Sequence, residues 1–138
     1  MRTSTCGPIC ALLFVTSLLT AGCGSSRQLQ SVALSPATAN AHDFANGQVP
    51  FSATGTFSKP PSPQRLTGSD ITWCVGSSAG HCAGNINLGA TVDSNGVAKC
   101  VPNFSGVATI LAGKATPSIN PDGESTLSVF GKAQLTCP

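Results

Sequence analysis

Apolar and polar residues alternate with a period of two along most of the chain after residue 28, and no segment of useful length shows a helical period. Such alternation is typical of β-strands that bury one face. Residues 107–112 are apolar on both faces, which predicts a central strand. The clearest hairpin signal is Asn95-Gly96. Strands are therefore expected at residues 29–36, 49–57, 71–75, 88–92, 97–101, 107–112 and 127–135.

The order of strands and turns predicts one all-β domain over residues 29–138. About seven short strands separated by frequent turns are typical of a two-sheet antiparallel β-sandwich. Trp73 alternates with Ile71 and Val75, which places its ring in the core. Glycine-rich residues 76–85 and proline-containing residues 114–124 are expected to be loops.

The amino-acid composition argues against a nucleic-acid-binding protein. Charged residues make up 9% of the chain, far below the usual quarter of a globular protein, and the formal net charge is only +2. Proteins that bind nucleic acids carry a dense basic patch, so we predict no nucleic-acid partner. The abundance of glycine and proline suits short strands and many turns.

The first residues predict export and lipid attachment. Arg2 precedes an apolar run over residues 9–19, which has the length of a signal peptide and is too short to span a bilayer. The small residues that lead to Cys23 resemble the bacterial lipobox, which implies removal of residues 1–22 and acylation of Cys23. Residues 23–28 would then form a flexible tether. The alternative is an ordinary secretory signal cut between Ala21 and Gly22, with Cys23 as a bystander.

The lipobox resemblance also implies a location. It predicts a lipid-anchored, extracytoplasmic protein of the bacterial cell envelope, with the membrane as its first partner. Gly24 stands where an aspartate would signal retention at the inner membrane, so the outer membrane or the cell surface is favoured.

Seven cysteines are present, and four of them remain after Cys23 and the signal segment are set aside. An even number in a small exported domain predicts two disulfides. Four cysteines allow three connectivities; we favour the pairing that closes a short glycine-bounded loop and ties the last strand to the domain. The alternative is a metal site of His81 with two of the thiolates, although structural zinc sites have closer cysteine pairs. The favoured pairs are Cys74 with Cys82 and Cys100 with Cys137.

Four sequence segments, in order, resemble the bacterial Ig-like domain of group 2. They are LQSVALSP at residues 29–36, GQVPFSATGTF at 47–57, ITW at 71–73, and VDSNGV at 92–97 followed by SGVATI at 105–110. The resemblance covers roughly residues 29–115 and implies an Ig-like two-sheet antiparallel β-sandwich. Cysteine pairs are not typical of that group.

The sequence contains few residues of the types that carry out catalysis. His42 and His81 are the only histidines, and neither lies in a nucleophile motif. Asp93 to Gly96 resembles part of a calcium loop, but it lacks the third ligand and the distant glutamate, so we interpret it as a turn. We therefore predict no enzymatic activity, no catalytic residues, no metal and no cofactor.

The leading hypothesis is a non-enzymatic, lipid-anchored Ig-like module with a structural or protein-interaction role. The alternative is a carbohydrate-binding module, suggested by the asparagine-, glycine- and serine-rich residues 76–87 and 114–124. The partner, an envelope protein or a glycan, is not identified by any motif.

Overall fold

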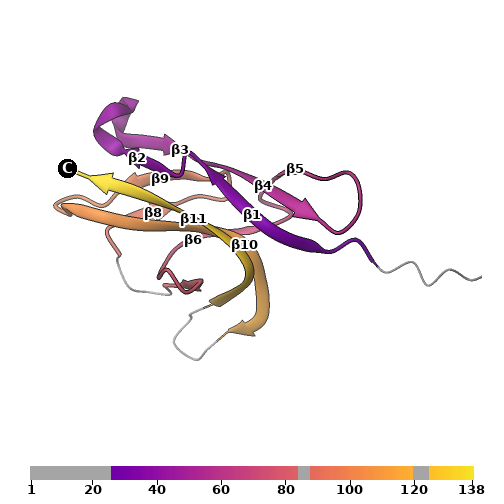
Figure 1. Ribbon diagram of the computed structural model, residues 1–138. Coiled ribbons are helices and arrows are strands. Elements are labelled where there is room, and N and C mark those ends of the chain that lie inside the picture. The colour runs from indigo at the N-terminus through magenta and orange to yellow at the C-terminus, as the bar shows by residue number, and fades with distance from the viewer. Residues whose placement is uncertain (1–25, 84–87, 120–124) are drawn as a thin grey trace, which may run out of the picture.

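A computed structural model describes residues 26–83, 88–119 and 125–138, without the side chains of residues 117–119. These residues form an all-β sandwich, which confirms the predicted fold class (Figure 1). Two short 3-10 helices interrupt the strands near residue 44. The strands are β1 (Leu29–Ser35), β2 (Thr38–Asn40), β3 (Gln48–Pro50), β4 (Ser52–Phe57), β5 (Gln64–Leu66), β6 (Thr72–Val75), β7 (His81–Cys82), β8 (Ala90–Val92), β9 (Val97–Cys100), β10 (Gly106–Ile119) and β11 (Ser125–Cys137); the helices are η1 (Ala41–Asp43) and η2 (Ala45–Gly47).

The strands form two layers. Only Phe51 separates β3 from β4, so this continuous run links sheet β1-β4-β5 to sheet β3-β9-β8 in the first layer. The second layer has the order β2-β11-β10-β6, and β7 adds to β11. All pairs are antiparallel except β2 with β11, which is parallel. The main core lies between the layers and takes residues from both, including Val32, Val49, Ile110 and Leu135.

Each of the seven predicted strands is present, and the largest difference lies in the last hairpin. The predicted loop at 114–124 is wrong over its first part, because β10 continues to Ile119 and pairs there with Ser125. The strand continues because β11 runs antiparallel to it and pairs with it as far as Ile119. Pro117 is tolerated because it lies outside the paired residues of β10: the register with β11 shifts between Ala115 and Ile119, and β6 pairs with β10 only as far as Gly113. Residues 120–124 lie outside the described part.

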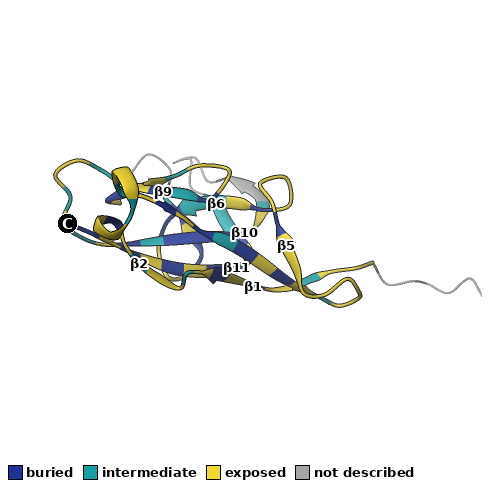
Figure 2. Ribbon diagram, turned by 90° about the horizontal axis from the view of Figure 1, so that it is seen from above, coloured by how far each residue is buried: buried dark blue, intermediate teal, exposed yellow. Residues whose placement is uncertain are grey.

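Strand β10 is buried on both faces, as its apolar run predicts. Ile110 and Leu111 are both 0% exposed. Ile110 belongs to the main core, whereas Leu111 lies on the outer face in a second cluster with Cys82 and Leu127. Figure 2 shows the alternation of buried and exposed positions along β1 and β11 that accompanies this arrangement.

The glycine-rich segment after β6 covers that outer face. A disulfide joins Cys74 to Cys82, and β7 pairs with the start of β11. A Cβ on Gly80 would come within 2.5 Å of the Phe130 ring, so glycine allows the segment to lie directly on the sheet. The described part of the predicted loop is therefore a packed cover over Leu111, and residues 84–87 lie outside the description.

Trp73 packs against the main core, as predicted, but it is half-buried rather than enclosed. Its ring lies against Gly96 of the β8–β9 turn, where a Cβ would come within 2.8 Å of the indole. The turn itself forms because Asp93 accepts hydrogen bonds from the backbone N–H groups of Asn95 (2.9 Å) and Val97 (2.8 Å). This geometry supports the interpretation of residues 93–96 as a turn.

The two layers approach each other closely at Gly131. A Cβ at this inward-facing position of β11 would lie 2.5 Å from the backbone oxygen of Val32 in β1. Since both partners of that contact are backbone, no side-chain rotation can relieve it. Ala112 and Ala133 beside it are also small, which keeps the sandwich thin where β1 crosses β11.

Replacing Gly131 by alanine is expected to lower the free energy of unfolding by about 1–3 kcal/mol, because the added methyl group must separate the layers. Urea unfolding followed by the fluorescence of Trp73 measures the change. Lys132→Ala, at the exposed neighbouring position, is the control and should stay within about 0.5 kcal/mol of the native protein. Equal stability of Gly131→Ala and the native chain would contradict this close approach.

Candidate binding surface at the distal end

The start of β1 and the C-terminus lie at opposite ends of the sandwich (Figures 1 and 2). The two 3-10 helices lie at the C-terminal end, which we call the distal end: residues 36–47 together with Lys99, Cys100 and 136–138. The Cys100–Cys137 disulfide joins β9 to the end of β11 and so connects the two layers there. The disulfide therefore fixes the two layers to each other at the distal end.

Local hydrogen bonds shape residues 40–47. The side chain of Asn40 accepts a hydrogen bond from the backbone N–H of His42 at 3.0 Å, which caps η1. The N–H of Gly47 donates to the carbonyl oxygen of Phe44 at 3.0 Å. Asn46 and Gly47 both have positive φ, 57° and 62°, which these residue types adopt at low cost. The Asn46-Gly47 turn brings the chain from the helical turns into β3.

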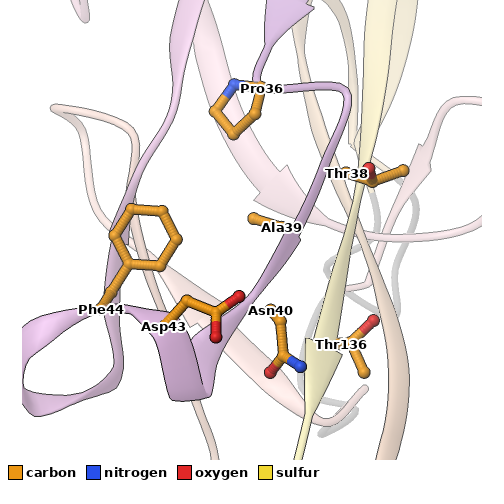
Figure 3. A pocket seen from close by; sticks show the side chains of 7 residues that line it. All are labelled: Pro36, Thr38, Ala39, Asn40, Asp43, Phe44 and Thr136. Carbon is orange, nitrogen blue, oxygen red and sulfur yellow. The ribbon is translucent and has the colours of Figure 1, made fainter.

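Phe44 separates two open hollows. One, of about 500 Å³, lies between its ring and the strands β2 and β11; the other, of about 300 Å³, lies on the side of Lys99 and Cys100. Figure 3 shows the first hollow, with the Phe44 ring on one side, Thr38 and Thr136 on the other, and the Asp43 carboxylate between them. The half-buried ring thus has accessible space on both sides.

The surface around Phe44 is mixed in polarity and close to neutral. His42 Nδ1 lies 3.9 Å from Asp43 Oδ1, and both side chains are well exposed. Exposed pairs of this kind contribute little to stability. Val107, the partner of Thr136 in the sheet, is 55% exposed and adds apolar surface nearby. An aromatic ring, hydroxyl groups, a carboxylate and an imidazole therefore converge without a strong charge.

The sequence-predicted cysteine sites fall into two groups. The structure joins Cys74 to Cys82 and Cys100 to Cys137, which is the pairing favoured above. Sulfurs bonded to each other are not thiolate ligands, so the alternative metal site with His81 is wrong. His81 Nδ1 lies 3.4 Å from Thr126 Oγ1 instead. Cys23 lies outside the described residues, and its acylation stays a prediction.

Three features concern the described ranges 26–83, 88–119 and 125–138: metal-ligand clusters, membrane-spanning helices and the positions of the histidines. There, no three histidine, cysteine or acidic side chains gather as a metal site would require. No helix in that part of the chain has the length and apolarity needed to cross a membrane. The two histidines are separated as well: His42 lies in η1 at the distal end, and His81 lies in β7.

The distal surface was not predicted from the sequence. Phe44 lies between two short 3-10 helices and Asn40 ends the three-residue strand β2, and the local sequence signal nearby is the turn at Asn46-Gly47. The predicted glycan-binding segments lie elsewhere: the described part of 76–87 covers Leu111, and residues 114–119 continue β10.

No family model matches this chain, and no curated protein is significantly similar to it. The resemblance to the group 2 bacterial Ig-like domain therefore stays a prediction.

Replacing Asn40 by alanine is expected to lower the free energy of unfolding by about 1 kcal/mol and to speed hydrogen exchange of the His42 amide, because the cap on η1 is lost. Amide exchange read by NMR measures the local effect. Asn46→Gly is the control, since glycine adopts the same positive φ at no steric cost. Unchanged exchange at His42 in Asn40→Ala would show that the cap does not hold this surface.

Proposed function

We propose that this protein is a lipid-anchored, non-enzymatic domain of the cell envelope that contacts another envelope molecule through its distal end. The observation that carries the proposal is the placement of the two chain ends. An anchor on Cys23, just before the described N-terminus, would hold one end of the sandwich near the membrane and direct the hollows beside Phe44 away from it (Figure 1).

Export is supported by chemistry as well as by the signal-like N-terminus. Two disulfides in one small domain are typical of an oxidising compartment and rare in the cytosol. The lipid would make the attachment stable, because several acyl chains each add about 0.8 kcal/mol per buried CH₂ group. A domain held in this way acts on neighbours within a short distance of the membrane surface.

A protein partner suits the distal end better than a small substrate. The hollows are open rather than enclosed, and they flank a single half-buried aromatic ring. Aromatic residues that fill a complementary pocket often dominate the energy of protein interfaces. The Asn40 cap on η1 and the Cys100–Cys137 disulfide fix the backbone on either side of Phe44 before binding, which lowers the entropy cost of association.

A glycan partner is the second candidate, and one observation favours it. The ring of Phe44 lies beside the side chains of Asn40 and Asp43 in the same hollow (Figure 3). An exposed ring face with amide and carboxylate groups next to it offers an apolar platform together with hydrogen-bond partners for hydroxyl groups. A protein partner and a glycan partner differ in whether protease treatment of the envelope extract removes binding.

Acylation is tested by metabolic labelling with an alkyne fatty acid. We expect the native chain to carry the label and Cys23→Ala to lose it completely, since the acylated sulfur is removed. Cys10→Ala is the control, because Cys10 lies in the segment that is cut away, and it should keep the label. A label that persists in Cys23→Ala, or its absence from the native protein, would contradict the lipid anchor.

Contact through the distal end is tested by photo-crosslinking in intact cells. We expect p-benzoylphenylalanine in place of His42 to form a specific adduct, whereas the same residue in place of Thr54, on the exposed face of β4, should form none. Adding Phe44→Ala should reduce the His42 adduct by about tenfold or more, as for loss of an interface hot spot. Equal adducts from both positions, or no effect of Phe44→Ala, would contradict the proposal.

A further inference from the structure

The end of the sandwich opposite the distal end carries a group of basic side chains. Arg27 precedes β1 and Lys59 follows β4, so both lie at this end, whereas Arg65 lies farther along the same sheet in β5, opposite Thr54; all three are exposed. We call these three residues the basic end. None of them forms an ion pair among the residues that the structure describes. Their charges are therefore available to a partner.

Arg27 is fixed in place by several contacts. Its guanidinium lies 3.4 Å from the centroid of the Phe57 ring. Nε donates to the carbonyl oxygen of Lys59 at 3.2 Å, and Nη2 donates to Gln64 Oε1 at 2.7 Å and to the carbonyl oxygen of Pro61. These acceptors are neutral, so they orient the guanidinium and leave its positive charge uncompensated.

Two hydrogen bonds next to Arg27 join Gln28 to Ser58. The N–H of Ser58 donates to the carbonyl oxygen of Gln28 at 2.9 Å, and the N–H of Gln28 donates to Ser58 Oγ at 2.9 Å. The chain is thus held against the β4–β5 connection from residue 27 onward. Arg27, which precedes this contact, therefore lies beside Lys59 at the start of β1.

Asp70 is an acidic group whose charge interacts with that of Arg27. Asp70 accepts hydrogen bonds from the backbone N–H (3.0 Å) and hydroxyl (2.8 Å) of Thr67, which lower its pKa together with a weaker effect of the Arg27 charge. Its single negative charge leaves the basic end with a net positive charge. The other described acidic residues are Asp43 at the distal end and Asp93 in the β8–β9 turn, which lies against Gly68 and adds one further negative charge to the three positive ones.

The chain between the anchor and the domain is short. Four residues lead from Cys23 to Arg27, and even a fully extended chain of that length spans at most about 14 Å. This is comparable with the Debye length of about 8–10 Å at physiological ionic strength. The basic end of an anchored molecule would therefore lie within reach of the electrostatic field of the membrane surface.

We propose that the basic end rests on the anionic lipid headgroups of the membrane that holds the anchor, and that this contact sets the orientation of the domain. The inference rests on the proposed acylation of Cys23. A short tether alone limits distance but leaves the domain to rotate. Attraction of three cationic side chains to the surface favours the orientation in which the distal end faces away.

The test uses the mature chain from Cys23, coupled through the Cys23 thiol to a maleimide lipid in vesicles. Lysines are acetylated to low conversion, and mass spectrometry gives the ratio of labelling at Lys59 to that at Lys132, which lies in β11. We expect vesicles with about one quarter phosphatidylglycerol to lower this ratio by about threefold or more against pure phosphatidylcholine. About 0.5 M NaCl should restore it, because salt screens the attraction.

Charge variants provide the matched comparison. Arg65→Gln, alone and with Arg27→Gln, should reduce the lipid-dependent protection of Lys59, whereas Lys99→Gln with Lys114→Gln should preserve it. Equal labelling ratios for the native chain in both lipids, or equal effects of the two variant pairs, would overturn the proposal. Because the coupling to lipid is chemical, this result is independent of the metabolic labelling that tests acylation in the cell.

Discussion

Ile110 and Leu111 are neighbours in β10, so their side chains leave the sheet on opposite faces, and both are fully buried. A two-layer sandwich buries only one face of each sheet, so Leu111 needs a cover of its own. The segment between β6 and β7 supplies it. The Cys74–Cys82 disulfide, the pairing of β7 with β11 and the close fit of Gly80 under Phe130 all serve that cover. Leu111 and Leu127 on the outer face thus explain why the segment from β6 to β7 packs against the sheet.

Strands β1, β2 and β11 determine where the two ends of the molecule lie. β1 begins at the basic end and crosses β11 at Gly131, where backbone contacts backbone. β2 then joins the second layer beside β11 and leads directly into η1. The distal surface is therefore positioned by strands that pack in the main core, while its own residues stay accessible. Rigid support of this kind is what a binding surface needs if it is to keep its shape before a partner arrives.

Much of the fold could be predicted because period-two alternation is a local signal. Ile71 to Val75 and the Asn95-Gly96 hairpin needed no knowledge of distant residues. β2 could not be found in this way, because three residues form a strand only when β11, about a hundred positions away, offers its edge. The continuation of β10 past Pro117 depends likewise on a distant partner. Phe44 shows the same limit for the site, since only the packed fold reveals that its ring separates two hollows.

The arrangement of β1 also has a mechanical consequence. A force applied between the N-terminal segment and the distal end would run along β1, nearly perpendicular to the hydrogen bonds that join it to β4. The six residue pairs from Leu29 to Ser35 would then be loaded together in shear, not opened one after another. At the far end, the Cys100–Cys137 bond would transmit the load between the layers. The domain is therefore built to resist traction along its length.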